Sequence, residues 1–179
     1  MNKFNTAIQL ARNIKTTGAL YQTSRKLGIE ISSKLPQKGK KIFVEFGLGH
    51  GNITQEILSK IDIHAKLYSF EVNKEFCEYV QKHIKDERLV IINDGAEALD
   101  KHIKTPIDGI VSSIPLTIFS AEKQDMIMQT IKKALQPNAY FSQIMYSKRL
   151  KKYLEKNFSS VAIESLVGIP MEYVYHCKV

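Results

Sequence analysis

The stretch Lys41-Ile-Phe-Val-Glu-Phe-Gly-Leu-Gly-His-Gly-Asn-Ile-Thr54 joins an apolar run to a glycine-rich turn and then to a segment of helical character. Gly47, Gly49 and Gly51 alternate through the turn. Glycine lets a backbone turn sharply and come close to a ligand, and the free N–H groups that begin a helix can hold a carboxylate or a phosphate. The stretch therefore predicts a buried strand, a turn that binds a nucleotide-like cofactor, and a helix.

The spacing of these glycines differs from the dinucleotide-binding fingerprint. That fingerprint is Gly-x-Gly-x-x-Gly, which needs a third glycine at position 52, where this chain has Asn52. The spacing therefore disfavours a nicotinamide cofactor.

Short apolar runs alternate with amphipathic segments beyond this stretch. The runs predicted as strands are residues 41–46, 65–70, 89–92, 107–112 and 139–146. The segments predicted as helices are residues 53–59, 74–84, 96–103 and 121–135. Because parallel neighbours need a crossover helix, this alternation predicts a mostly parallel sheet that is covered on both faces.

The pattern changes after Tyr146. A short basic helix is predicted over residues 148–156, followed by extended runs over 161–167 and 171–178. The two runs are joined across Gly168-Ile-Pro170, a spacing that suits an antiparallel hairpin finishing the sheet.

Acidic residues follow two of the predicted strands. Glu71 precedes Val72 after the second strand, and Asp94 precedes Gly95 after the third. Open α/β sheets bind ligands at the carboxyl ends of their strands, where a carboxylate can accept from both hydroxyls of a ribose. Each acid alone could also be a helix cap. Three such elements in order favour one binding site, with Asp94 on its adenine side.

Composition limits the class of protein. The chain has 179 residues, 44% of them hydrophobic and 25% charged, which suits one soluble globular domain. No apolar run approaches the length of a membrane span, and the first residues lack the apolar stretch of a secretion signal. Cys77 and Cys177 form no metal-binding pattern. These features predict a cytoplasmic protein without a metal.

The excess of positive charge lies in one part of the chain. Residues 1–41 contain nine basic residues and one acid, whereas residues 42–179 contain 17 of each. Such asymmetry suggests an anionic partner, either nucleic acid or a lipid surface.

The N-terminal segment is predicted to contain two helices. A helix over residues 2–15 would carry a continuous apolar side from Phe4 to Ile14 with basic flanks, and a second is expected over 24–34 after a break at Thr16-Thr-Gly18. A bilayer interface requires such an apolar side and a phosphate backbone does not. We therefore expect residues 2–15 to dock on anionic membranes, although the same side could instead pack on the sheet.

This ordered set of elements resembles the class I S-adenosylmethionine-dependent methyltransferases. Their first motif is similar to residues 44–51, their ribose-binding acid to Glu71, their adenine-side segment to residues 92–95, and their fourth motif to residues 108–116. Within that class, Val111-Ser-Ser-Ile-Pro-Leu116 resembles the Ser-x-Leu-Pro element of bacterial phospholipid N-methyltransferases, which methylate phosphatidylethanolamine. Further similar segments are Gly18-Ala19 with Ser24-Arg25, Gln143-x-x-Tyr146, and Ile169-Pro170 with Tyr173-Val-Tyr175.

The resemblance implies a Rossmann-like α/β fold with a seven-stranded, mostly parallel sheet and S-adenosyl-L-methionine as cofactor. It implies one methyltransferase domain over residues 1–179, with a helical lid or membrane-docking segment over 1–36 and a catalytic core over 37–179. The residues expected to contact the cofactor are Glu45, Gly47, Gly49, Gly51, Asn52, Glu71, Val72, Asp94, Gly95 and Ser112.

The implied substrate is the amine of a membrane lipid, phosphatidylethanolamine or a related aminolipid. We therefore expect peripheral attachment to an anionic membrane surface, with no obligate protein partner. The main alternative is an rRNA adenine N6-methyltransferase, whose fourth motif reads Asn-x-Pro-aromatic to hold and stack a flipped base. Ser113 and Leu116 stand at those positions here and can do neither job well, which makes nucleic acid a less favoured partner. A methyltransferase for a soluble small molecule and a non-enzymatic lipid-binding domain are also open.

Methyl transfer from a sulfonium chiefly requires alignment of the acceptor and exclusion of water. A lipid amine must also lose a proton before it attacks. Tyr146 is the first candidate for orienting the amine and Tyr21 the second, with Ser112 and Ser113 holding it near the methyl group. None of these side chains is a strong base, so the sequence leaves the acceptor of the proton open.

Overall fold

The computed structural model describes residues 18–167 and 171–179, with side chains described from residue 25 onward. The predicted docking helix over residues 2–15 lies outside this range. The elements in chain order are α2 (Gly18–Ile31), β1 (Ile42–Phe46), α3 (Asn52–Lys60), β2 (Lys66–Phe70), α4 (Lys74–His83), β3 (Leu89–Ile92), a 3-10 turn (Ala96–Ala98), α5 (Leu99–His102), β4 (Ile107–Ser112), a second 3-10 turn (Leu116–Ile118), α6 (Ala121–Ala134), β5 (Leu135–Met145), α7 (Lys151–Asn157), β6 (Ser160–Leu166) and β7 (Glu172–Lys178).

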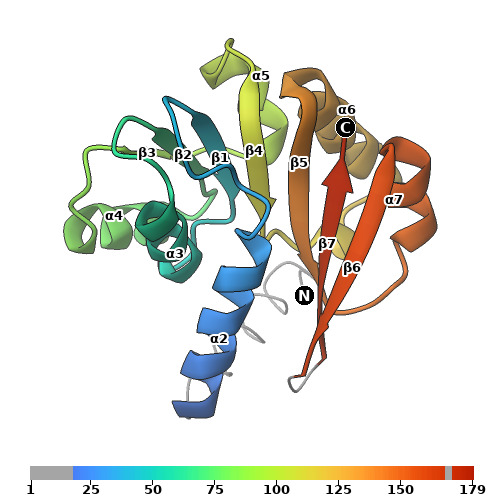
Figure 1. The fold of residues 1–179 in the computed structure, drawn as a ribbon, viewed down its shortest axis with the longest axis horizontal. Helices are drawn as coiled ribbons and strands as arrows, with labels where there is room; N and C mark the ends of the chain where they lie inside the picture. Colours follow the sequence, from blue (N-terminus) through green and yellow to red (C-terminus); the bar gives the residue numbers. More distant parts are fainter. Residues whose placement is uncertain (1–17, 168–170) are drawn as a thin grey trace.

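The seven strands form one mixed sheet in the order β3-β2-β1-β4-β5-β7-β6. The first five of these are parallel, whereas β7 runs antiparallel between β5 and β6. This confirms the predicted Rossmann-like sheet and its C-terminal hairpin. The carboxyl ends of β1 to β5 meet at one edge, which is the lower edge in Figure 1.

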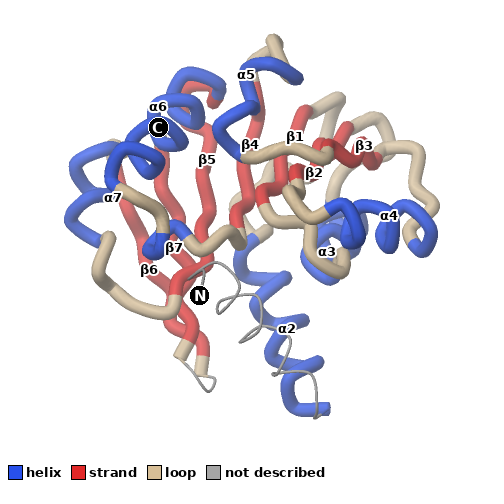
Figure 2. Tube along the Cα trace, turned by 180° about the vertical axis from the view of Figure 1, so that it is seen from behind, coloured by secondary structure: helices blue, strands red, loops and turns tan. Residues whose placement is uncertain are grey.

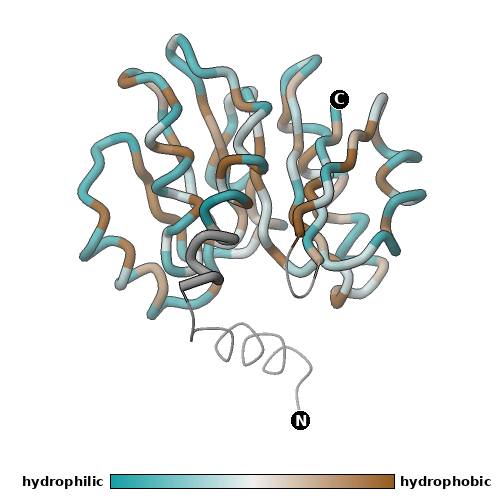
Figure 3. Tube along the Cα trace, turned by 60° about the horizontal axis from the view of Figure 1, so that its bottom comes forward, coloured by the Kyte–Doolittle hydropathy of each residue, from teal (hydrophilic) through white to brown (hydrophobic). Residues whose placement is uncertain are grey.

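Helices cover both faces of the sheet (Figures 1 and 2). On one face, Leu27 and Ile31 of α2 pack with Ile57 of α3 against strand residues such as Phe43. The other face is covered by α5, α6 and α7 through Leu99, Ile127 and Leu154. Figure 3 turns the lower edge forward and shows hydrophilic and hydrophobic stretches alternating along the outer helices, as expected of helices with one buried side. Cys77 and Cys177 are buried free thiols.

Three predicted boundaries were wrong. The helix expected over residues 24–34 begins at Gly18, which we had placed in a break, and ends at Ile31. The helix expected over residues 96–103 is a 3-10 turn followed by one short turn of α-helix. The fifth strand begins at Leu135 instead of residue 139, because it pairs with Ile107 across a register shift. Asn138 adopts a positive φ of 67° within that irregular part, a conformation that asparagine tolerates better than most residues.

A buried polar chain fixes α2 to the sheet. The Ser142 hydroxyl lies 2.7 Å from His176 Nδ1, and His176 Nε2 lies 3.0 Å from Glu30 Oε1. A carboxylate can only accept, so Nε2–H donates to Glu30 and Nδ1 accepts from Ser142 in the neutral ring. Because His176 is buried, this pairing orients α2 over β5 and β7.

None of the helices in residues 18–167 and 171–179 is both long enough and apolar enough to cross a bilayer.

The buried His176 imidazole makes the free energy of unfolding decrease as pH falls. Burial lowers the pKa of His176, outweighing the hydrogen bond and charge of Glu30, which oppose the shift. The unfolded chain therefore binds the proton first as pH falls below about 6.5, and the free energy of unfolding decreases. We expect His176→Asn to lose less stability than the parent between pH 7 and pH 5 in denaturant unfolding.

His64→Asn serves as the control for this experiment, because His64 is exposed and should leave the pH dependence of the parent unchanged. Parallel pH profiles for His176→Asn and the parent would show that the buried ring carries no such penalty.

Candidate active site

The glycine turn lies at the carboxyl end of the central strand β1. Gly47 N–H donates to Phe70 O at 2.9 Å, and Gly51 N–H donates to Leu48 O at 2.9 Å. Gly47, Gly49 and Gly51 have φ values of 89°, 52° and 84°, a region that L residues with a side chain rarely adopt. Asn52 is the first residue of α3, so the turn leads directly into a helix start as predicted.

The three glycines have different surroundings. A Cβ atom on Gly47 would lie 2.6 Å from Ser113 Oγ, and one on Gly51 would lie 2.7 Å from Ile84 Cδ1. A Cβ on Gly49 would meet nothing within 4 Å. Gly47 and Gly51 are therefore needed for internal packing, whereas Gly49 borders open space that a ligand can fill.

Glu71 is held beside Gly49. Gly49 N–H donates to Glu71 Oε2 at 3.1 Å, and Asn73 N–H donates to Glu71 Oε1 at 2.8 Å. A carboxylate offers about four acceptor positions, so each oxygen keeps one for a ligand hydroxyl. The geometry fits a carboxylate that accepts from a ribose, because its two oxygens are oriented by backbone donors.

The residues expected on the adenine side lie along the same edge. Val72 is exposed directly after Glu71. Asp94 follows β3, where its Oδ2 accepts from His102 Nε2 at 2.9 Å and its Oδ1 accepts from Gly95 N–H at 2.8 Å. The hydrogen bond from His102 lowers the pKa of Asp94. Their roles in binding stay predictions.

Glu45 lies beneath the turn with only 1% of its surface exposed. Its Oε2 accepts from Thr54 Oγ at 2.8 Å and from Ser69 Oγ at 2.6 Å. Oε1 is buried and has no hydrogen-bond partner among the described residues. Burial raises the pKa of Glu45 from 4.5 to about 7, although the Ser69 and Thr54 hydroxyls oppose the shift. The sequence pointed to Glu45 but not to these two partners, which come from separate elements.

The end of β4 is tied to the glycine turn. Ser113 N–H donates to Phe46 O at 2.9 Å, and Ser113 Oγ donates to Gly47 O at 2.9 Å. The Ser113 hydroxyl thus holds the turn in place. The Ser112 hydroxyl is fully buried and has no hydrogen-bond partner among the described residues. It is therefore more available to a ligand than the Ser113 hydroxyl.

Tyr146 directly follows β5 at the same edge, and 60% of its surface is exposed. Partial burial raises the pKa of Tyr146, and the negative charge of Glu172 raises it further. Sequence analysis did not select Glu172. The sequence predicted a hairpin of residues 161–167 and 171–178 but not the pairing of β7 with β5, which brings the first residue of β7 to this edge. Tyr21 lies in α2, and its side chain is outside the described part of the structure.

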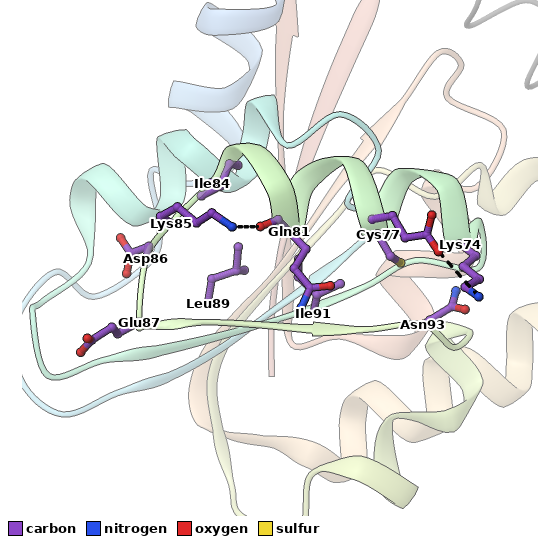
Figure 4. Close-up of a pocket in the computed structure, with 11 residues that line it drawn as sticks. Lys74, Cys77, Gln81, Ile84, Lys85, Asp86, Glu87, Leu89, Ile91 and Asn93 are labelled. Carbon is purple, nitrogen blue, oxygen red and sulfur yellow. Dashed lines mark hydrogen bonds and ion pairs between the residues drawn. The ribbon is translucent and has the colours of Figure 1, made fainter.

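A surface groove lies away from the glycine turn, between α4 and the edge strand β3 (Figure 4). Its volume is about 740 Å³, and it approaches the ligand-binding edge only at Lys74 and Asn93. Charges of both signs line it, and Lys74 pairs with Glu78 at 3.6 Å. Because its polar groups do not converge, we assign no binding role to this groove. No group of three or more side chains that could hold a metal ion occurs in the described residues.

Comparison with known proteins identifies the fold. No family model matches the sequence. A curated relative, the ornithine lipid N-methyltransferase of Singulisphaera acidiphila, is 23% identical over 115 residues, which cover 62% of this chain and 60% of the relative. The match therefore spans less than two thirds of that relative's length.

Two solved structures superpose over most of the chain. A Streptococcus mutans protein in complex with SAH has a TM-score of 0.69 at 16% identity, covering 86% of this chain and 97% of its own. An rRNA methylase from Streptococcus thermophilus has a TM-score of 0.65 at 18% identity, covering 86% and 95%. The chain has the fold of the class I methyltransferases, as predicted.

The buried Glu45 carboxylate predicts a second pH effect, opposite in sign to that of His176. Its pKa is raised on folding, so stability is fully present below pH 4.5 and falls as pH rises to about 7. The shift corresponds to about 3 kcal/mol. We expect Glu45→Gln, which still accepts from Thr54 and Ser69, to be more stable than the parent at pH 8 by up to this amount and nearly equal to it at pH 5.

Denaturant unfolding at both pH values measures this difference. The exposed Glu87→Gln is the control and should follow the parent at each pH. If Glu45→Gln were less stable than the parent at pH 8, the buried carboxylate would be ionised at little cost.

Proposed function

We propose that this chain is an S-adenosylmethionine-dependent N-methyltransferase that acts on the amine of a membrane lipid. The observation that carries the cofactor assignment is the pair formed by Gly49 and Glu71. A backbone that borders open space lies beside a carboxylate whose two oxygens are oriented and only partly used. The fold of the chain and the SAH complex of the Streptococcus mutans protein support this assignment.

The residues present fit the cofactor in chemical terms. Glu71 accepts from the ribose hydroxyls, and the turn at Gly49 lets the backbone approach the ligand. Glu45 Oε1, buried without a hydrogen-bond partner among the described residues, offers an unused acceptor near the turn. S-adenosylmethionine supplies a methyl group that is already electrophilic, so the protein's task is to align the acceptor and keep water out.

Two structural features favour an acceptor other than a nucleobase. Leu116, which stands where an adenine methyltransferase has its stacking ring, is only 2% exposed and belongs to the hydrophobic core. Ser113, which stands where such an enzyme has its amide, donates its hydroxyl to Gly47 O. Neither side chain is therefore available to hold or stack a flipped base. The 23% identity to an ornithine lipid N-methyltransferase supports a lipid amine instead.

The distribution of positive charge refines the proposed membrane contact. Lys38 and Lys40 are exposed, but they precede β1 and so lie at the edge of the sheet opposite the glycine turn. Arg25 and Lys26 are exposed on α2, which extends past the ligand-binding edge in Figure 1. We propose that residues 2–15 dock on the bilayer and that the bilayer contacts the face that carries α2, so that peripheral attachment brings the aminolipid to that edge.

Cofactor binding is tested by a matched pair of glycine variants. Gly49→Ala and Gly39→Ala both place a methyl group on a residue of positive φ in open surroundings, at a cost to stability of about 1 kcal/mol each. Only Gly49 borders the proposed ligand, so we expect Gly49→Ala to weaken the binding of S-adenosylhomocysteine by roughly tenfold or more. Isothermal calorimetry measures the affinity. Equal affinities for the two variants would place the ligand elsewhere.

The substrate class is tested by transfer of a labelled methyl group. Purified protein is incubated with labelled S-adenosylmethionine and, in separate reactions, with vesicles of phosphatidylethanolamine and anionic lipid, with total RNA, and with a pool of soluble amines. We expect label in the aminolipid and none in RNA, because Leu116 is buried and Ser113 is engaged. Gly49→Ala should lower the transfer. Label confined to RNA or to soluble amines would reject the lipid substrate.

A further inference from the structure

The pairing of β5 with β7 brings a carboxylate to the acceptor end of the site. Met145 pairs with Tyr173 in this antiparallel ladder, so Tyr146 and Glu172, one residue further, come to the same edge of the sheet. That edge continues from the glycine turn after β1, past Ser113 after β4, to Tyr146 after β5 and Glu172 at the start of β7. Glu172 therefore lies on the side of Tyr146 that is away from the proposed cofactor.

The Glu172 carboxylate has an oxygen that a donor could use. Its side chain is partly buried, and its Oε2 atom is shielded from solvent without a hydrogen-bond partner among the described residues. Burial also raises the pKa of this carboxyl group. An oxygen in this state gains strongly from a cationic donor, because charge-assisted hydrogen bonds are the stronger ones and a buried charge needs a partner.

The charged and aromatic neighbours leave this position open to a cation. Lys148 Nζ lies over the ring of the next residue, Tyr173, at 5.1 Å, and no ion pair joins a described residue to Glu172. Tyr146 presents an exposed ring, and Glu172 acts on its hydroxyl electrostatically. An aromatic side chain and a carboxylate oxygen without a partner among the described residues, at one edge of the sheet, are groups suited to an ammonium ion.

We infer that Glu172 and Tyr146 together form the binding site for the ammonium group of the acceptor. The Glu172 carboxylate accepts from the ammonium N–H groups, and the Tyr146 ring lies against the same cation. The inference rests on the proposed function in one respect, namely that the acceptor enters at this edge. It names the substrate class as a cationic primary amine, as opposed to a neutral or anionic acceptor.

Binding of a soluble headgroup tests the inference without methyl transfer. Glycerophosphoethanolamine is titrated into the protein loaded with S-adenosylhomocysteine, for the parent, Glu172→Gln and Glu164→Gln. Glu164 is an exposed carboxylate on β6, the neighbouring strand, and serves as the matched control. We expect Glu172→Gln to bind the amine at least about tenfold more weakly, as expected for loss of a charged hydrogen bond, while Glu164→Gln matches the parent.

Tyr146 is tested by the same titration. Tyr146→Phe keeps the aromatic face and should retain most of the affinity, whereas Tyr146→Leu should lose it. All variants should bind S-adenosylhomocysteine as the parent does, which shows that they are folded and that only the acceptor side has changed. In vesicle assays, Glu172→Gln should raise the KM for aminolipid more than it lowers kcat.

The outcomes separate this inference from the proposed function. If the parent does not bind the amine, or if Glu172→Gln binds it as well as the parent, the inference is overturned. If the parent binds the amine through Glu172 but transfers no label to aminolipid vesicles, the ammonium-binding site is supported and the lipid substrate is rejected.

Discussion

The site depends on the hydrogen bonding of β1 between its two parallel neighbours. The ladder continues beyond the end of the strand, because Gly47 N–H donates to Phe70 O of β2 and Ser113 N–H donates to Phe46 O. These bonds hold the glycine turn against the end of β4, and a Cβ on Gly47 would collide with Ser113. The turn is therefore shaped by both neighbouring strands before any ligand binds, which reduces the ordering that binding would require.

Two buried titratable groups make the stability of the fold depend on pH in opposite directions. Glu45 lies under the turn with a pKa of about 7, so its ionisation costs stability as pH rises. His176 links α2 to the sheet with a lowered pKa, so its protonation in the unfolded chain costs stability as pH falls. Over the range from about pH 4.5 to 7 the two groups therefore change the free energy of unfolding in opposite directions. Both groups lie on the face that α2 and α3 cover.

The edge divides into two parts with different chemistry. Gly49 and Glu71, at the ends of β1 and β2, present backbone and an oriented carboxylate suited to a nucleoside. Tyr146 after β5 and Glu172 in β7 supply an aromatic ring and a carboxylate oxygen without a partner among the described residues, the groups that we propose bind a cationic amine. The buried Ser112 hydroxyl lies at the end of β4 between them. A methyltransferase needs these two parts side by side, since its chemistry consists mainly of alignment.

The sequence alone predicted the parallel sheet, the glycine turn and the position of Glu71 directly after the second strand. Apolar periodicity and glycine spacing are local patterns, so they can be read from a few neighbouring residues. It did not predict the early start of β5, whose first residues pair with Ile107 across a register shift. Tertiary structure alone decided that Leu116 is buried, that the Ser113 hydroxyl donates to Gly47 O, and that Glu172 comes to the same edge as Tyr146. These properties depend on which distant strands become neighbours and on what then packs between them, and no local pattern encodes that choice.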